Sequence, residues 1–319
     1  MKIDSHETGA QLLMRPRGQR RIALVTGGTD GIGKAIAHTL VKESIAVVVV
    51  GSNAEKGAAA VRELRNASGN DHVEFLQADL SLMRNVDALA VQVCARWPQL
   101  HYLVLCAGIM RGRYGLTSEG VEANFAINYL SRFALTEALL PGLTAGGVVD
   151  DPARILVIGG AAQNGHIYYD DVNLTRRFNM LRVVSQFCEA NDEFVLEQAR
   201  RVAAARPLRH VTVTTLKVGV VRTEIRRQFP PWMRLAVPLL DPFLSSSANE
   251  IAASARRLLL GREFANVTGA LFRHIKRFKE LQPGARTDDP AKGRQLWDFS
   301  KQLITQARAR PGEVRAAMV

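Results

Sequence analysis

The stretch that decides the fold is "LVTGGTDGIGKA" (24–35), a glycine-rich loop between an apolar run and a helix-period segment. Gly27 permits a tight turn, Gly31 lets the backbone approach a pyrophosphate, and Gly33 allows close helix packing. The amides at the start of the following helix face the bound anion. Because strand, loop and helix occur in the required order, the stretch predicts a dinucleotide-binding site near the start of the chain.

Apolar strand-like runs alternate with helix-period segments outward from this loop. Such alternation predicts right-handed βαβ crossovers, and therefore an α/β fold with one doubly wound parallel sheet covered by helices on both faces. The expected strands are 21–26, 46–50, 73–78, 102–107, 154–159, 210–218 and 268–273, and the expected helices are 32–43, 54–66, 82–96, 120–140, 187–205, 247–260 and 293–308.

Length and composition predict one folded domain. The chain has 319 residues, of which 47% are hydrophobic, and no apolar run is long enough to span a membrane. We expect the domain over 21–310, a flexible basic tail or short organellar presequence at 1–20, and a C-terminal tail at 311–319. Three cysteines without disulfide or metal-ligand spacing indicate no metal site and an intracellular location, in the cytoplasm or in an organelle matrix such as the mitochondrial one.

The net charge of +12 is concentrated in one segment. Residues 200–277 contain thirteen arginines and two lysines against four acidic residues, a net charge of +11. A segment of this kind is either solvated surface or a binding site for an acidic protein, RNA or an anionic membrane.

Further motifs follow the glycine loop in a familiar order: "QADLS" (77–81), "LCAGIM" (105–110), "FAINYL" (125–130) and "LKVGVVRTEI" (216–225). Together they resemble the classical short-chain dehydrogenase/reductase superfamily over residues 21–305. The stretches "LTSEGVEANFAINYLSRFALT" and "LWDFSKQLI" are most similar to its retinol-dehydrogenase and WW-domain-oxidoreductase branch. The resemblance implies a Rossmann-like fold and NAD(P)-dependent oxidoreductase activity.

The resemblance also implies roles for single residues. Asp79 would touch the adenine amine, and Asn128 would be the structural asparagine of the catalytic tetrad. Cys106 stands where the family's NNAG segment has its second asparagine, and Val218 stands at the proline of its PG motif. The implied cofactor-binding residues are Thr26, Gly27, Gly31, Ile32, Gly33, Ser52, Asp79, Leu80, Ala107, Gly108, Gly219 and Thr223.

The cofactor is NAD or NADP. Ser52 and Asn53 stand where this branch usually has an arginine for the 2′-phosphate of NADP, and no acidic residue is placed for the ribose hydroxyls of NAD. Asp30 would repel an additional phosphate, whereas Lys56 could compensate for that repulsion.

The proton relay of the family is missing. Its chemistry needs a tyrosine and a lysine four residues apart on one helix face, together with a serine that polarises the carbonyl. Gly159 and Gly160 stand in place of the serines. Cys188 and Asp192, or Phe187 and Asn191 one residue earlier, stand in place of the tyrosine and lysine, and no lysine occurs between positions 56 and 217.

These losses favour a pseudoenzyme that retains a nucleotide and has a binding or structural role. Asp192 would raise the pKa of Cys188, so this thiol is a poor substitute acid. One alternative is a non-standard oxidoreductase, or a cofactor-assisted isomerase or cyclase, with its acid/base on the 164–171 loop at His166, Tyr168 or Tyr169. Another is a subunit of an RNA or ribonucleoprotein assembly bound through residues 200–277.

Two further partners are expected. The apolar stretch 229–244 lies in the 229–262 region where the family has its substrate lid, which suggests a lipophilic small molecule. The helices corresponding to 117–145 and 187–205 commonly pair between family members, so the resemblance implies a homodimer.

Overall fold

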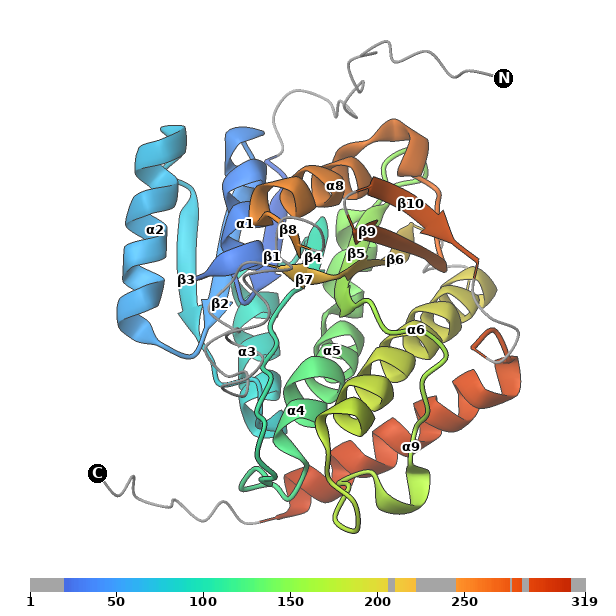
Figure 1. Cartoon of the computed structure of the whole chain (residues 1–319). Helices are drawn as coiled ribbons and strands as arrows, with labels where there is room; N and C mark the ends of the chain where they lie inside the picture. Colours follow the sequence, from blue (N-terminus) through green and yellow to red (C-terminus); the bar gives the residue numbers. More distant parts are fainter. Residues whose placement is uncertain (1–19, 206–209, 222–244, 276, 283–286, 311–319) are drawn as a thin grey trace.

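An eight-stranded sheet runs through the centre of the molecule (Figure 1). The computed structural model describes residues 20–205, 210–221, 245–275, 277–282 and 287–310. The strand order is β10-β9-β6-β5-β4-β1-β2-β3, and every pair is parallel except β9 with β10. This confirms the predicted Rossmann-like fold. The strands are β1 (Ile22–Thr26), β2 (Ala46–Gly51), β3 (Val73–Gln77), β4 (Tyr102–Leu105), β5 (Ala153–Gly160), β6 (Val211–Val218), β9 (Ala270–Ile275) and β10 (Arg277–Leu281), with a separate pair of β7 (Val220–Val221) and β8 (Ser245–Ser246).

Helices cover both faces of the sheet (Figure 1). One apolar core lies between the sheet and α1, α2 and α8, and the other lies between the sheet and α3, α5, α6 and α9. No helix in the described part of the chain has the length and apolar character needed to cross a bilayer. The helices are α1 (Gly31–Lys42), α2 (Ala54–Ser68), α3 (Met83–Arg96), α4 (Ala123–Phe125), the π-turn η1 (Ala126–Leu130), α5 (Ser131–Gly146), the 3₁₀ turn η2 (Tyr169–Asp171), α6 (Met180–Ala204), α8 (Ala248–Leu260), the 3₁₀ turn η5 (Arg262–Phe264) and α9 (Pro290–Ala309).

Three elements differ from the sequence-based expectation. The helix expected at 120–140 is divided by η1, around Asn128. Helix α6 begins before the predicted residue 187, because the Asn179 side chain accepts a hydrogen bond from Arg182 N and caps the helix. Strand β10 was not predicted, since "RFKEL" is mostly charged and lies at the edge of the sheet.

The strand order creates a crevice between β1 and β4. From β1 the chain builds β2 and β3 toward one side, and then returns to place β4 on the other side of β1. At such a switch point the loops leaving the two carboxyl ends diverge, and ligands bind between them. The glycine loop leaves β1 here and the "CAGIM" segment leaves β4 (residues 106–110).

Helix α9 packs against α5 and α6 through aromatic side chains. The Trp297 ring lies 4.8 Å from Phe133 and 6.4 Å from Phe194, and the hydroxyls of Tyr129 and Ser300 are 2.6 Å apart. Helix α6 is buried almost continuously from residue 186 to 199. Helix α9 therefore covers part of α5 and α6, and the homodimer that the resemblance implied stays a prediction.

We predict that Trp297→Ala lowers the free energy of unfolding by about 3–5 kcal/mol, because it removes a large aromatic side chain that is 3% exposed. Chemical denaturation measures the change. Gln295→Ala, at an exposed position of the same helix, is the control and should cost less than about 0.5 kcal/mol. Equal losses in the two variants would show that α9 does not belong to the core.

Candidate active site

The glycine loop forms a cradle that side chains would fill. Gly27 and Gly31 have φ angles of +67° and +52°, in the left-handed region that favours glycine. A Cβ atom on Gly33 would lie 2.2 Å from the carbonyl oxygen of Gly27, and one on Gly27 would lie 2.9 Å from the Ala107 backbone. The Thr26 hydroxyl accepts hydrogen bonds from Cys106 N and Ala107 N at 3.0 and 3.1 Å, which ties the loop to the end of β4. The backbone therefore leaves room for a pyrophosphate at the start of α1.

A cleft extends from this cradle across the carboxyl ends of β1, β2 and β4. Most of the predicted cofactor-binding residues line it. Thr26 lies behind the loop, Gly219 lies beside Ile275 of β9, and Thr223 is outside the described residues. The predicted residues that line the cleft are Gly27, Gly31, Ile32, Gly33, Ser52, Asp79, Leu80, Ala107 and Gly108.

An ion pair lies at the end of the cleft next to β2. The Lys56 Nζ is 3.3 Å from an Asp30 carboxylate oxygen, and both side chains are about half exposed. The other Asp30 oxygen accepts from Gly31 N at 2.7 Å and caps α1. Ser52 follows β2, and the Asn53 side chain caps α2. The charges that an additional phosphate would meet here are therefore a lysine and the aspartate bound to it.

We predict that Lys56→Gln weakens NADPH binding by roughly three- to tenfold while NADH binding changes less than about twofold, because only NADPH carries the additional phosphate. Asp30→Asn should strengthen NADPH binding relative to NADH binding, because it removes a negative charge near the additional phosphate. Asparagine preserves the helix cap. Calorimetric titration of each variant with both dinucleotides measures the difference. Equal changes for the two dinucleotides would show that the pair does not face the 2′-position.

Asn128 fixes the chain that follows β4. Its amide donates to Ile109 O at 2.8 Å and to Asn124 O at 2.9 Å, and its carbonyl oxygen accepts from Ile109 N at 3.2 Å. The π-turn at η1 places this side chain toward the loop. Asn128 therefore holds the backbone of Ile109, which lines the cleft.

Arg132 is a buried cation that the sequence reasoning missed. It donates to the carbonyl oxygens of Ala107 and Ile158 and to Asn191 Oδ1, at 2.8 to 3.2 Å. Burial lowers the pKa of its guanidinium to about 10. The available signal was an arginine four residues after Asn128, in a helix whose one other charged residue is Glu137. Arg132 joins the ends of β4 and β5 beneath the cleft.

The residues that the sequence reasoning aligned with the proton relay pack against each other. A Cβ atom on Gly160 would lie 2.7 Å from Cys188 Sγ, so a serine there would require this thiol to shift. Burial, opposed in part by the Lys217 charge, raises the pKa of the Cys188 thiol to about 11. The sequence left two alignments of this helix with the relay open. In the structure Cys188 and Asp192 face the ends of β5 and β6, whereas the Asn191 amide donates to Asn128 O.

Asp192 is paired with a lysine from a different element. Lys217 of β6 lies next to Gly159 in the sheet register, and its ammonium group forms a buried ion pair with the Asp192 carboxylate. The two side chains are 1% and 6% exposed. Burial raises the pKa of Asp192 to about 6, although the charge of Lys217 opposes this shift. Sequence reasoning recorded Lys217 only as the first lysine after Lys56 and missed the pairing.

We predict that Lys217→Met lowers the free energy of unfolding by about 3–5 kcal/mol, because it leaves a buried carboxylate without its partner. Adding Asp192→Leu should recover most of that loss. The control is Lys34→Met, which removes an exposed pair with Glu63 and should cost less than about 1 kcal/mol. Denaturant titration would contradict the account if Lys217→Met cost no more than the control.

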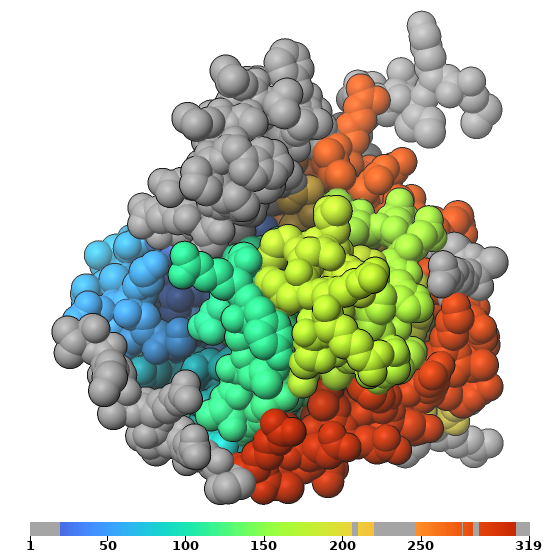
Figure 2. Space-filling view, turned by 60° about the horizontal axis from the view of Figure 1, so that its bottom comes forward, coloured from blue at the N-terminus to red at the C-terminus, as the bar shows by residue number. Residues whose placement is uncertain are grey.

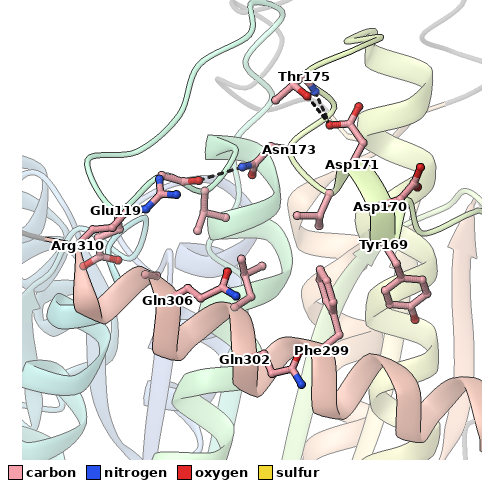
Figure 3. A pocket seen from close by; sticks show the side chains of 15 residues that line it. Glu119, Tyr169, Asp170, Asp171, Asn173, Thr175, Phe299, Gln302, Gln306 and Arg310 are labelled. Carbon is pink, nitrogen blue, oxygen red and sulfur yellow. Dashed lines mark hydrogen bonds between the residues drawn. The ribbon is translucent and has the colours of Figure 1, made fainter.

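The candidate substitutes on the 164–171 loop lie along α6 and not in the cleft lining. Gly165 N donates to Glu189 and Tyr168 N donates to Gln186, which hold the loop against the helix. His166 is exposed with its ring 4.6 Å from that of Tyr168. Tyr169 packs 5.1 Å from Phe299 of α9 and lines a second, polar cavity (Figure 3). None of the three candidates is among the cleft residues named above.

Glu193 is a buried acid next to this loop. Its Oε2 atom and the Tyr169 hydroxyl are buried, and neither has a hydrogen-bond partner in the described part of the chain. Burial, with the neighbouring charge of Glu189, raises the pKa of Glu193 to about 8, and the same two causes together with Glu193 raise that of Tyr169. The folded protein therefore holds a proton on Glu193 over a pH range in which the unfolded chain releases it.

This proton makes stability depend on pH. Below the ordinary glutamate pKa of 4.5 both states are protonated, and between 4.5 and about 8 only the folded state keeps the proton, so stability falls as pH rises through that range. We predict that Glu193→Gln weakens this fall and stabilises the protein most at pH 8 and above. Thermal unfolding of the unmodified chain and of the variant, followed across this pH range, measures the difference in stability. Glu63→Gln, at an exposed site, is the control, and an identical pH slope in both variants would contradict the assignment.

The basic segment 200–277 does not present all its charge to solvent. Lys217 is buried, and much of the segment lies outside the described residues (206–209, 222–244 and 276). Four of its described arginines form ion pairs: Arg200 with Asp288, Arg201 with Glu197, Arg256 with Glu43, and Arg257 with Glu263.

The crevice, the glycine cradle and the residues around it define a dinucleotide-binding α/β protein. Residues 21–164 match the short chain dehydrogenase family. Human retinol dehydrogenase 13 is 30% identical over 290 residues, covering 89% of this chain and 84% of the relative. Human polyprenol dehydrogenase is 30% identical over 305 residues, covering 92% and 91%. The chain belongs to the short-chain dehydrogenase family.

A solved relative contains the cofactor. The Pseudomonas aeruginosa RhlG/NADP active-site complex superimposes with a TM-score of 0.64 and 26% identity, over 79% of this chain and 94% of that one. The glycine cradle of this chain, which added Cβ atoms would fill, fits the same class of group. The cleft is therefore a nicotinamide-dinucleotide site, and NAD and NADP both remain open.

Proposed function

We propose that this protein binds a nicotinamide dinucleotide without catalysing the family's alcohol–carbonyl oxidoreduction, and that it has a binding or structural role. The observation that carries the proposal is the buried pair of Lys217 and Asp192 beside Cys188. The resemblance aligns Asp192 and Cys188 with the family's lysine and tyrosine. A dinucleotide supplies hydride chemistry when it is bound. The residues of this chain around it supply the cradle, the cleft walls and the packing beneath them.

Proton transfer to a substrate oxygen needs a group that can reach it and has a pKa near the working pH. Cys188 is 3% exposed and packed on Gly160, and its pKa is raised away from neutrality. The Lys217 ammonium group is bound to Asp192, and its charge does not offset the rise that burial causes in the pKa of Cys188. Asn128 remains, but its hydrogen bonds hold the backbone.

The ligand that accompanies the dinucleotide is proposed to be lipophilic. The relatives at 30% identity are named for retinol and polyprenol, both of which are lipophilic alcohols. We propose that this chain binds an alcohol or carbonyl compound of that class beside the dinucleotide without converting it.

The test is turnover of NADH, NADPH, NAD and NADP with a panel of lipophilic and simple alcohols, aldehydes and ketones. We expect the dinucleotide to be consumed no faster than in buffer. Turnover that is lost in His166→Ala or Tyr168→Phe would overturn the proposal in favour of a relocated acid/base on the 164–171 loop. Turnover that survives those changes and is lost in Lys217→Met would overturn both the proposal and the relocated acid/base on the 164–171 loop.

A further inference from the structure

Two surface segments, 110–118 and 172–184, lie side by side on the face shown in Figure 2, where they are coloured green-teal and yellow-green. The rings of Tyr114 and Phe178 meet edge to face at 5.6 Å. Asn173 ties the second segment to the chain that follows the first, because its amide donates to Gly120 O at 3.0 Å (Figure 3). Its oxygen also accepts from Glu122 N at 2.8 Å. The two segments therefore form one preformed surface, which we call the arginine–leucine surface.

This surface exposes apolar side chains. Leu181, in the first turn of α6, is 84% exposed, and Tyr114 and Leu116 are 45% and 44% exposed. They make up three of the six exposed large hydrophobic residues in the described part of the chain. A soluble surface normally hides or scatters such residues, and their concentration on adjoining segments indicates a contact with another apolar phase.

The same surface is strongly basic. Its two segments carry Arg111, Arg113, Arg176, Arg177 and Arg182. The neighbouring acids are already engaged: Asp171 accepts from the backbone and hydroxyl of Thr175 and from Arg176 N, and Asp170 lies 3.4 Å from Arg176.

Three of these arginines form none of the ion pairs found in the described part of the chain. No ion pair involves Arg111, Arg113 or Arg177 within the described residues, and all three are exposed. Positive charge and exposed leucine and tyrosine side chains therefore occur together on one surface.

We infer that the arginine–leucine surface docks on an anionic membrane. A bilayer interface accepts both features at once, since leucine and tyrosine side chains enter the headgroup layer while arginines bind anionic headgroups. Leu181 is 84% exposed, which suits insertion into lipid better than recognition of an acidic peptide.

Docking would also place the dinucleotide cleft at the membrane. Ile109 lines the cleft and lies two residues before Arg111, so the surface begins at the cleft margin. Such a position would let a lipophilic ligand pass between the bilayer and the cleft, and this consequence alone rests on the proposed function. The docking itself depends only on the surface.

The experiment is flotation of the full chain with phosphatidylcholine vesicles, with and without phosphatidylserine. We expect partition only into the anionic vesicles. Arg113→Gln with Arg177→Gln should lower the partition constant roughly tenfold or more, and Leu181→Gln should lower it several-fold. The matched controls are Arg62→Gln with Arg294→Gln, and Val91→Gln, all at exposed positions on other helices, and they should change it little.

Absence of partition by the unmodified chain would overturn the inference. So would partition that the surface variants leave unchanged, which would assign it to another basic segment. Loss with the arginine variants but not with Leu181→Gln would also overturn it, because attraction to any polyanion would then suffice. Dinucleotide affinity, measured on every variant, separates this outcome from a failure of the proposed function.

Discussion

A carboxylate on the buried side of α6 requires a counter-charge, and in this protein the requirement is met by Lys217 from β6. Taking both groups out of water is costly, so each depends on the other to remain charged. The pair links β6 of the parallel sheet to α6, the longest helix in the described part of the chain. It lies at the carboxyl ends of β5 and β6, and Asp192 stands at a position that the resemblance aligned with the lysine of the family's proton relay.

The dinucleotide cleft depends on different interactions. The glycine cradle, the Thr26 hydroxyl and the Asn128 amide hold the ends of β1 and β4, and Arg132 supports them from below through carbonyl oxygens. None of these contacts involves the Lys217–Asp192 pair. A change of chemistry next to the nicotinamide end is therefore compatible with an intact site for the rest of the cofactor.

The fold could be predicted from the sequence because its signals are local. The glycine loop and the alternation of apolar runs with helical segments fix the sheet and its switch point. The sequence predicts the absence of the relay, since no lysine lies between positions 56 and 217. The sequence did not decide whether Cys188 or Phe187 faces Gly160, because helix periodicity leaves this alignment uncertain by one residue.

Other features depend on packing between distant segments. Lys217 reads as an ordinary strand residue until α6 brings Asp192 to it. His166, Tyr168 and Tyr169 follow the strand whose end faces the site, yet hydrogen bonds to Gln186 and Glu189 direct their loop along α6. The exposed Leu181 became visible only once α6 was found to begin at Met180.

The central claim is that a retained dinucleotide cleft lies beside a replaced proton relay, and a single-turnover experiment tests both halves together. With the protein in excess over NADPH or NADH, nicotinamide fluorescence reports binding, and absorbance after addition of a lipophilic aldehyde reports oxidation. The account predicts saturable binding followed by an unchanged reduced dinucleotide. Oxidation of the bound dinucleotide, or no binding of either one, would contradict it.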